Sequence, residues 1–371
     1  MKVIIYISLF SIIFGVKINY GQSYKQLIDY ADVNADAGDY YGASLYYEQA
    51  MREDSTKIEV LYKYANALRM YNNYSKAAYY YSKVWAKDKG GRIYKDAAFW
   101  LATMQKYNGE YRTASKTWKK VKSKYGRNKK GFEYLKAKQE ALSCNYANRI
   151  KNDSTENIFV NNIGEKINTT DSEFGATRVN NELYFNSLRA TNLSEGLEVK
   201  DPIYKVKHYK GELTDSSIKQ SKLIKGIINN ESLHNANSSF NSSNGLLYFT
   251  QCDSLNNCKL VVSKLEGENW SEPKTLSERI NASGATTTQP NYCRIGGQDY
   301  LFFVSNRKGG MGKLDIWYTK ILDGGTYSKP INAGKLVNSI DNEVTPFYDT
   351  VDNVLYFSST CVKSYPRTFV L

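Results

Sequence analysis

The hydrophobic pattern changes in character about two fifths of the way along the chain. Residues 23–150 place apolar residues at helical spacing with few turn-forming residues. Residues 160–371 instead alternate short runs of β-branched and aromatic residues with Asn, Gly, Ser and Asp. The sequence therefore predicts an α+β multidomain protein with an α-helical first part and an all-β second part. The polar stretch 151–165 is expected to be the linker.

A repeat can be counted in the helical part. Tyr40, Tyr74 and Tyr111 each follow a polar pair, at spacings of 34 and 37 residues. Each tyrosine has an alanine nine positions before it, an alanine three positions after it and an aromatic residue seven positions after it. The repeat-defining residues of this part are Ala31, Tyr40, Ala43, Ala65, Tyr74, Ala77, Ala102, Tyr111 and Ala114. Small residues let two helices pack closely, and a period of about 34 residues resembles the tetratricopeptide repeat.

We therefore expect residues 22–150 to form a tetratricopeptide solenoid of about three repeats. The longer second spacing predicts a small insertion at residues 87–92, between two helix pairs. Residues 132–147 are expected to form a capping helix, because an end repeat must cover its exposed core.

The β part repeats as well. Aromatic pairs recur at 184–185, 248–249, 302–303 and 356–357, at spacings of 64, 54 and 54 residues. Each is preceded by a polar lead-in, and two units share a closing segment of Trp or Tyr followed by Ser-x-Pro, at 270–273 and 327–330. A unit of this kind holds about four short strands, the content of one propeller blade.

The best-preserved unit lies at residues 301–318, where two apolar runs flank a glycine-dense turn and predict a β-hairpin. Its repeat-defining residues are Arg307, Gly309, Gly310, Gly312 and Asp315. Asp315 is expected to cap the turn or bond to the neighbouring backbone. A phosphate-binding loop is the alternative, but the glycines lack the GxxxxGK[ST] pattern and join two strands.

The β-propeller over residues 166–371 is expected to be incomplete. Its fourth repeat breaks off after residue 359, and four repeats are fewer than the six or so blades of a typical closed ring. A fragment, a truncated product and a paralogue completed by another chain all remain open.

An export signal is expected at the N-terminus. Lys2 precedes an apolar run over residues 3–16, and small Gly21 follows. This run is short for a membrane span but suits the core of a signal peptide, which we place at residues 1–21. A buried helix or a retained anchor is the alternative.

The five cysteines allow one local disulfide. Cys252 and Cys258 flank a turn-forming insert between two expected strands, and an exported chain can form disulfides. Whether they are bonded is left open. The number of cysteines is odd and no CxxC pair occurs, so a zinc site is not expected.

Basic residues concentrate on one local surface. The net charge is +13, and residues 106–151 alone carry 14 basic and 3 acidic side chains. A candidate basic patch for partner binding is formed by Lys116, Lys119, Lys120, Lys122, Lys124, Arg127, Lys129 and Lys130. It could recruit an acidic partner, a phosphate-bearing envelope component or anionic lipid. The alternative is a solvated face that only aids solubility.

No catalytic residues, cofactor or metal are predicted. The two histidines, His208 and His234, lie in polar contexts and are expected on the surface. A Ser/His/Asp triad would need one of them, and no GxSxG motif supports it. A calcium role for Asp315 lacks clustered acidic partners.

The combination of these repeats resembles a known family. The Ser305-Asn306-Arg307 string, its glycine turn and Leu314-Asp315-Ile316 look like the WD-type propeller repeat of exported bacterial proteins. A tetratricopeptide array before such a propeller resembles the OmpA-family envelope proteins of Bacteroidota, whose members include the type IX secretion component PorE. No OmpA-like peptidoglycan-binding domain is found, so any association with peptidoglycan is expected to be indirect.

The resemblance implies a non-enzymatic scaffold in the periplasm, associated with the outer membrane. Its partners would be outer-membrane or secretion-system proteins, and nucleic acid is not expected as a partner. One alternative is a TolB-like propeller adaptor that binds a peptidoglycan-associated lipoprotein. The other alternative is a propeller-bearing hydrolase.

Overall fold

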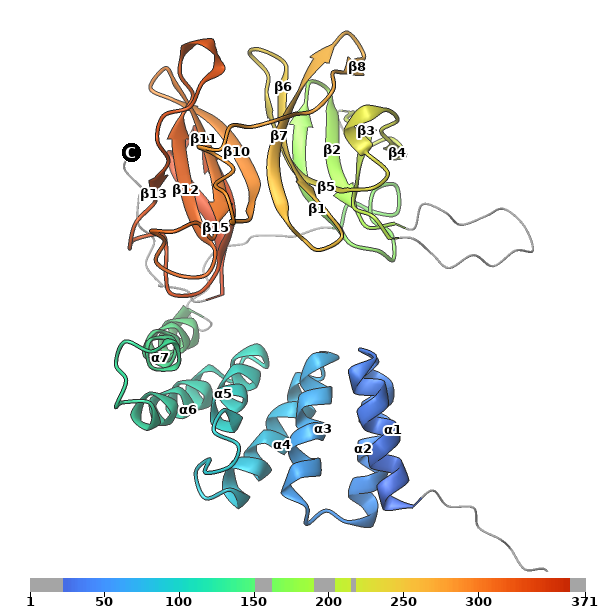
Figure 1. Ribbon diagram of the computed structural model, residues 1–371, viewed down its shortest axis with the longest axis vertical. Coiled ribbons are helices and arrows are strands. Elements are labelled where there is room, and N and C mark those ends of the chain that lie inside the picture. The colour runs from blue at the N-terminus through green and yellow to red at the C-terminus, as the bar shows by residue number, and fades with distance from the viewer. Residues whose placement is uncertain (1–22, 151–161, 190–203, 215–217, 361–371) are drawn as a thin grey trace, which may run out of the picture. The chain divides into compact units, whose positions relative to one another are not determined.

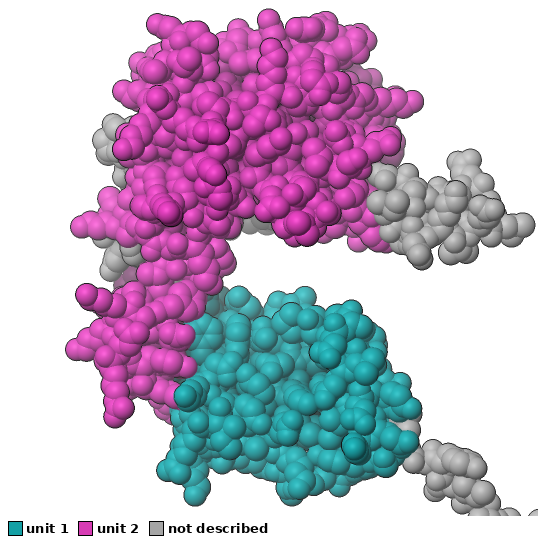
Figure 2. All heavy atoms as spheres, in the orientation of Figure 1, with its two compact units in different colours: residues 1–117 teal, residues 118–371 magenta. Residues whose placement is uncertain are grey.

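The computed structural model describes residues 23–150, 162–189, 204–214 and 218–360. The chain divides into two compact units, residues 1–117 and 118–371 (Figure 2). Their border falls within the helix Tyr111–Lys124. The expected signal peptide and most of the expected linker lie outside the described residues.

The first unit is an array of helical hairpins (Figure 1). Its helices are α1 Tyr24–Asp36, α2 Tyr40–Glu53, α3 Ile58–Met70, α4 Tyr74–Lys87, α5 Ala97–Tyr107 and the start of α6 Tyr111–Lys124. The polar pair before each even-numbered helix has a defined role. Gly38 and Asn72 adopt positive φ angles of 84° and 69°. Asp39 and Asn73 then cap α2 and α4 through their side chains.

The predicted repeat positions form the core of this array. The paired alanines Ala31/Ala43 and Ala65/Ala77 are completely buried, as are Ala102 and Ala114. The aromatic positions seven residues after the tyrosines are buried too, with Tyr81 fully inaccessible. Residues without long side chains at the helix crossings allow the close approach that the tetratricopeptide fold needs. The predicted helical solenoid is confirmed.

The predicted insertion is the loop between α4 and α5. It holds its shape through Asp88, which is buried and accepts the backbone N–H groups of Ile93 and Tyr94 at 3.0 and 2.8 Å. Gly90 and Gly91 supply the positive φ angles that the turn requires.

The second unit contains the end of α6, helix α7 and a series of antiparallel sheets (Figure 1). The helix α7 spans Phe132–Ile150 and includes the expected capping helix. The first sheet has β1 Glu173–Val179, β2 Glu182–Ser187, β3 Lys207–Glu212 and β4 Lys222–Leu223. The second has β5 His234–Asn241, β6 Leu246–Cys252, β7 Cys258–Glu266, β8 Asn269–Trp270 and β9 Lys274–Thr275.

The third sheet has β10 Thr287–Ile295, β11 Gln298–Ser305, β12 Asp315–Lys320 and β13 Ile331–Asn332. The pair β14 Glu343–Asp349 and β15 Val354–Ser359 begins a fourth. Each sheet runs in chain order from its first strand, except that β9 of the second sheet pairs with β7. The connections contain η1 Ile227–Asn229 and η2 Asp323–Gly325. This order is that of propeller blades, so the predicted all-β part has the expected fold.

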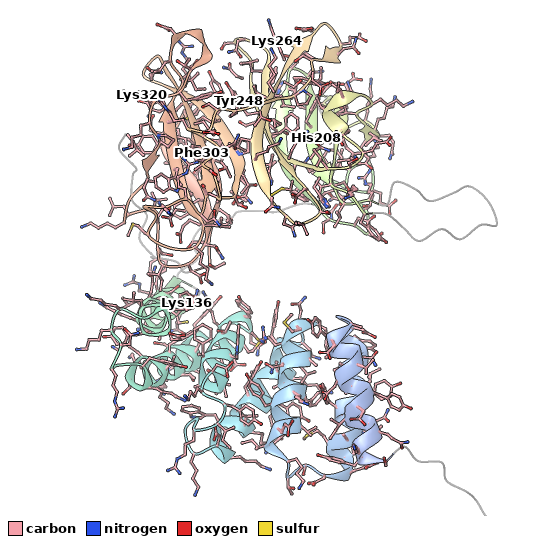
Figure 3. All side chains as sticks on the ribbon, viewed as in Figure 1. Lys136, His208, Tyr248, Lys264, Phe303 and Lys320 are labelled. Carbon is pink, nitrogen blue, oxygen red and sulfur yellow. A yellow bond between two sulfur atoms is a disulfide. The ribbon has the colours of Figure 1, made fainter. Side chains whose placement is uncertain are left out.

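Neighbouring blades are joined through bulges in their first strands. Each of β1, β5, β10 and β14 shifts register once. The residues with positive φ at these bulges are Gly175, Asn237, Gln289 and Thr345. The N–H of Asn237 bonds to Asn186 Oδ1 of the preceding blade at 2.8 Å. Between the second and third blades, Tyr248 and Phe303 share one hydrophobic core (Figure 3).

Buried charges link α7 to the loop before β14. Lys136 Nζ lies 2.7 Å from Asp341 Oδ2 and 3.0 Å from Glu140 Oε1 (Lys136 is labelled in Figure 3). Lys313 Nζ lies 3.1 Å from the other oxygen of Asp341. Burial alone would raise the pKa of Asp341, but the two ammonium groups hold it below its usual value.

Candidate protein-interaction surfaces

A network of aromatic and charged side chains covers one face of the helical unit. The hydroxyl of Tyr62 on α3 donates to both carboxylate oxygens of Asp96, at 2.9 and 2.8 Å. Trp100 Nε1 on α5 donates to the same carboxylate at 2.9 Å. Tyr94 stacks on Tyr62 with ring centroids 4.3 Å apart. Burial and the bond to Asp96 raise the pKa of Tyr62 to about 12, so the phenol stays a donor at neutral pH.

Arg69 extends this network along α3. Its guanidinium lies 3.8 Å from the ring centroid of Trp100, and its Nε donates to Tyr81 Oη at 3.0 Å. Stacking of this kind fixes a planar cation against an aromatic face.

An ion pair on the same helix, α3, extends this set of contacts to α1. Asp32 of α1 lies 2.8 Å from Lys63 Nζ of α3 and also accepts the hydroxyl of Tyr47. We call the set Asp32, Tyr62, Lys63, Arg69, Asp96 and Trp100 the α3 cluster. All six side chains are half-buried, so they are ordered by one another and still reach solvent. Tyr, Trp and Arg in fixed positions are the residue types that dominate binding energy at protein interfaces.

The predicted basic patch occupies α6 and the loop that follows it. Lys116, Lys119 and Lys120 are exposed at spacings that place them on one helix face. Arg127, Lys129 and Lys130 are exposed in the loop, whereas Lys122 and Lys124 are half-buried. Among the described residues, no carboxylate forms an ion pair with Lys116, Lys119 or Lys120. Partner binding by this patch stays a prediction.

Arg307 of the best-preserved hairpin has a packing role. Its guanidinium lies 4.7 Å from the ring centroid of Phe303 and 5.4 Å from that of Trp317. It donates to the carbonyls of Arg279, at 3.1 Å, and Ile280. Burial lowers its pKa to about 10, still well above neutral pH. The charged side chain therefore connects the strands β11 and β12 to the loop between β9 and β10.

The first blade repeats this arrangement with Arg189. Its guanidinium lies 4.6 Å from the ring centroid of Tyr209 and 5.7 Å from that of Phe185, and it donates to the carbonyl of Ile167. Two blades thus use a half-buried arginine that covers aromatic rings and donates to a backbone carbonyl, which indicates a structural role for the repeated Ser-x-Arg string.

The glycine turn does not leave its backbone open for a phosphate. The N–H groups of Met311 and Gly312 both donate to the carboxylate of Asp315, the second at 3.1 Å. Asp315 is buried and caps the turn as expected. A Cβ on Gly312 would lie 2.5 Å from the carbonyl oxygen of Ser339, so this glycine is required by a close backbone approach.

The second blade has Asp253 at the position of the arginine, and a disulfide joins two of its strands. Cys252 and Cys258, which face each other across β6 and β7, are bonded. The pairing that the sequence left open is therefore present. Among the described residues, Cys144 is buried, and Cys293 is a free, buried cysteine. Burial raises the pKa of the Cys293 thiol to about 12, which makes it a poor nucleophile.

The expectation that both histidines lie on the surface is wrong for His208. It lies in β3 and is completely buried, with its ring edge-on to Phe249 at a centroid distance of 5.1 Å. The polar neighbour Lys207 suggested an exposed strand, but it is itself buried and donates to the carbonyls of Asn229 and Asn230. His234 begins β5 and is half-buried, and its Nδ1 accepts the N–H of Val206 at 3.2 Å.

Sequence reasoning missed a repeated asparagine. Each of three asparagines bonds through its side-chain amide to one residue in the third strand of its blade, accepting the N–H of that residue and donating to its carbonyl. The asparagines are Asn229, Asn281 and Asn338. Each follows a buried Ile or Val. The recurring Ile/Val-Asn pair, at spacings similar to those of the aromatic pairs, is the pattern that could have revealed them.

Two further observations concern the described part of the chain only. None of its helices combines the length and apolarity needed to cross a membrane. Its His, Cys, Asp and Glu side chains do not gather in threes in a way that could hold a metal ion.

Comparisons with known proteins give weak likenesses. No protein-family model matches the sequence, and no curated protein matches it. The first TPR domain of human RPAP3 is 18% identical with a TM-score of 0.28, over 35% of this chain and 96% of that domain. TolB from Acinetobacter baumannii is 13% identical with a TM-score of 0.34, over 54% of this chain and 40% of TolB. An α-L-arabinofuranosidase from Clostridium thermocellum is 15% identical with a TM-score of 0.34, over 53% of this chain and 65% of that enzyme. Likenesses of this size carry no argument about what the chain binds.

Proposed function

We propose that the protein is a non-enzymatic scaffold that binds partner proteins in the envelope of a bacterium of the Bacteroidota type. The α3 cluster is the observation that carries this proposal. It keeps two aromatic rings and an arginine half-exposed and fixed, so a partner would meet a surface that needs little ordering on binding.

The proposed location is the periplasm, in association with the outer membrane. The apolar N-terminal run and the bond between Cys252 and Cys258 support export to an oxidising compartment. The order of the helical array and the propeller blades, which resembles OmpA-family proteins such as PorE, supports a role in type IX secretion, in gliding or in linking the outer membrane to peptidoglycan.

Site-specific photo-cross-linking tests the proposal. Thr103 lies one turn after Trp100 on α5, so p-benzoylphenylalanine at position 103 samples the face of the α3 cluster. The same amino acid at the exposed Tyr41 on α2 is the matched control. In living cells of a Bacteroidota host, we expect cross-links to an outer-membrane or secretion protein from position 103 and not from position 41.

A second variant separates a real interface from chance proximity. Trp100→Ala removes the ring that Arg69 covers and should abolish the cross-link from position 103. Equal labelling from both positions, or a partner from the cytoplasm, would refute the scaffold proposal. A peptidoglycan-associated lipoprotein as the partner would instead favour the TolB-like adaptor.

A further inference from the structure

The helical unit contains a groove away from the α3 cluster. Helices α2, α3 and α4 enclose a hollow of about 330 Å³, the lower end of the range for ligand-binding clefts. It is lined by Glu48, Met51, Arg52, Ser55, Leu61, Tyr79, Tyr80, Lys83 and Lys87. None of these belongs to the α3 cluster, so the groove is a separate feature.

The groove combines an apolar base with basic walls. Leu61 is buried, and Met51 and Tyr80 are half-buried. Tyr79 exposes 54% of its surface and packs edge-on against Tyr80, with ring centroids 5.0 Å apart. Lys83 Nζ lies 5.1 Å from the ring centroid of Tyr79.

Most charges around the groove are already compensated. Glu48 is paired with Lys76 at 3.0 Å, and hydrogen bonding to Glu48 raises the pKa of Lys76 above its usual value. Lys87 Nζ donates to the carbonyl of Ser55 at 3.0 Å and helps to lower the pKa of Asp54, after the hydrogen bonds from Thr56.

Arg52 and Lys83 remain, on opposite walls. Both are exposed, and no ion pair joins either to a carboxylate among the described residues. Helices α2 and α4 both end at the groove, and each helix end contributes roughly half a negative charge. Arg52 and Lys83 carry two positive charges, and the two helix ends together contribute about one negative charge, so the groove is electropositive.

We propose that this groove binds a short acidic segment of a partner polypeptide. An apolar side chain of the segment would pack on Met51, Leu61 and Tyr80, and flanking carboxylates would reach Arg52 and Lys83. A free phosphate or a lipid headgroup fits less well, because neither would use the apolar base. The site is independent of the α3 cluster and adds a second binding face to the scaffold.

Fluorescence anisotropy with the full chain tests this inference. The probe is the fluorescein-labelled peptide Ser-Glu-Glu-Leu-Glu-Ser, and its all-glutamine counterpart is the ligand control. We expect the glutamate peptide to bind at least tenfold more tightly. Arg52→Gln and Lys83→Gln should each weaken its binding about tenfold, the loss expected for one charge-assisted hydrogen bond.

The control variant carries Lys119→Gln and Lys120→Gln. It removes two positive charges from the basic patch, as many as Arg52→Gln and Lys83→Gln together remove from the groove. It should keep wild-type affinity, as should Trp100→Ala in the α3 cluster. Failure of the glutamate peptide to bind, no effect of Arg52→Gln, or an equal loss in the patch variant would overturn the proposal. Displacement of the peptide by millimolar inorganic phosphate would also overturn it, in favour of a small-anion site. Carbodiimide coupling should join peptide carboxylates to Lys83 before the patch lysines.

Discussion

Lowering the pH should destabilise the propeller unit through His208. Asn186 Oδ1 accepts the backbone N–H of Asn237, so its amide nitrogen must face the histidine and donate to Nδ1, 2.9 Å away. The imidazole is thereby held neutral, with its proton on Nε2. Complete burial, with a smaller contribution from the charge on Lys207, lowers the pKa of His208 to about 3.

The size and sign of the effect follow from linkage. An unfolded histidine has a pKa of about 6.5, so below that pH the unfolded state takes up a proton that the folded state refuses. The contribution of neutral His208 to the free energy of unfolding is fully present above pH 6.5. It is lost as the pH falls toward 3, at up to about 1.4 kcal/mol per pH unit. Between pH 7 and pH 5, His208 alone should cost the propeller unit about 2 kcal/mol.

Urea unfolding at pH 7 and pH 5 measures this loss, with hydrogen exchange in peptides that cover β3 reporting on the propeller unit alone. The variant His208→Gln should lose about 2 kcal/mol less than the wild type between the two pH values. His234→Gln is the control. Burial also lowers the pKa of His234, but this side chain is only half-buried, so its replacement should change the pH dependence less than that of His208. Equal losses in the wild type and in His208→Gln would refute the reasoning. So would a His208 resonance that titrates near pH 6.5 in NMR spectra, where only two histidines contribute.

Three further predictions concern side-chain contacts that stabilise the blades, and each is measured by urea unfolding of the propeller unit. Asn338→Ala should cost about 1–3 kcal/mol, because the buried N–H of Ile316 loses its partner, while the Ile316 carbonyl still accepts the N–H of Ala333; a loss below 0.5 kcal/mol would contradict the role of the repeated asparagine. Arg307→Lys should cost about 1–3 kcal/mol, because an ammonium cannot stack between two rings and bond two carbonyls at once; wild-type stability would show that charge alone suffices. Reduction of the bond between Cys252 and Cys258 should cost about 2 kcal/mol at most, as expected for so short a loop; the double serine variant should lose the same amount and become insensitive to reductant.

The helical core was predictable because its causes are local. A completely buried alanine such as Ala65 reflects a helix crossing at a fixed place in each repeat, and that place recurs in the sequence. The glycine turn was predictable for the same reason. Asp315 caps the turn through the N–H of Gly312, which lies close to it in the sequence. The need for glycine at position 312 has a distant cause, because the backbone near Ser339 approaches it.

The bulges in the first strands of the blades were not predictable in this way. The four bulges place positive φ angles on Gly175, Asn237, Gln289 and Thr345, four different residue types. Only glycine and asparagine favour that conformation by themselves. At Gln289 and Thr345 the conformation must be imposed by tertiary contacts, such as the bond from the Thr345 N–H to Gln289 Oε1 at 2.7 Å. Single-residue preference therefore cannot locate these bulges.

The α3 cluster lies between these two cases, and its geometry suggests how such faces could be found. Tyr62 and Asp96 are 34 residues apart, one repeat of the solenoid, and Asp32 and Lys63 are 31 apart. Successive first helices of a solenoid lie side by side, so residues about one repeat apart meet across them, as residues four apart meet along one helix. A search for complementary pairs at this separation would have selected both contacts from the sequence. No such rule reaches His208, whose partners Asn186 and Phe249 are 22 and 41 residues away on different strands, because blade loops vary in length and fix no constant separation.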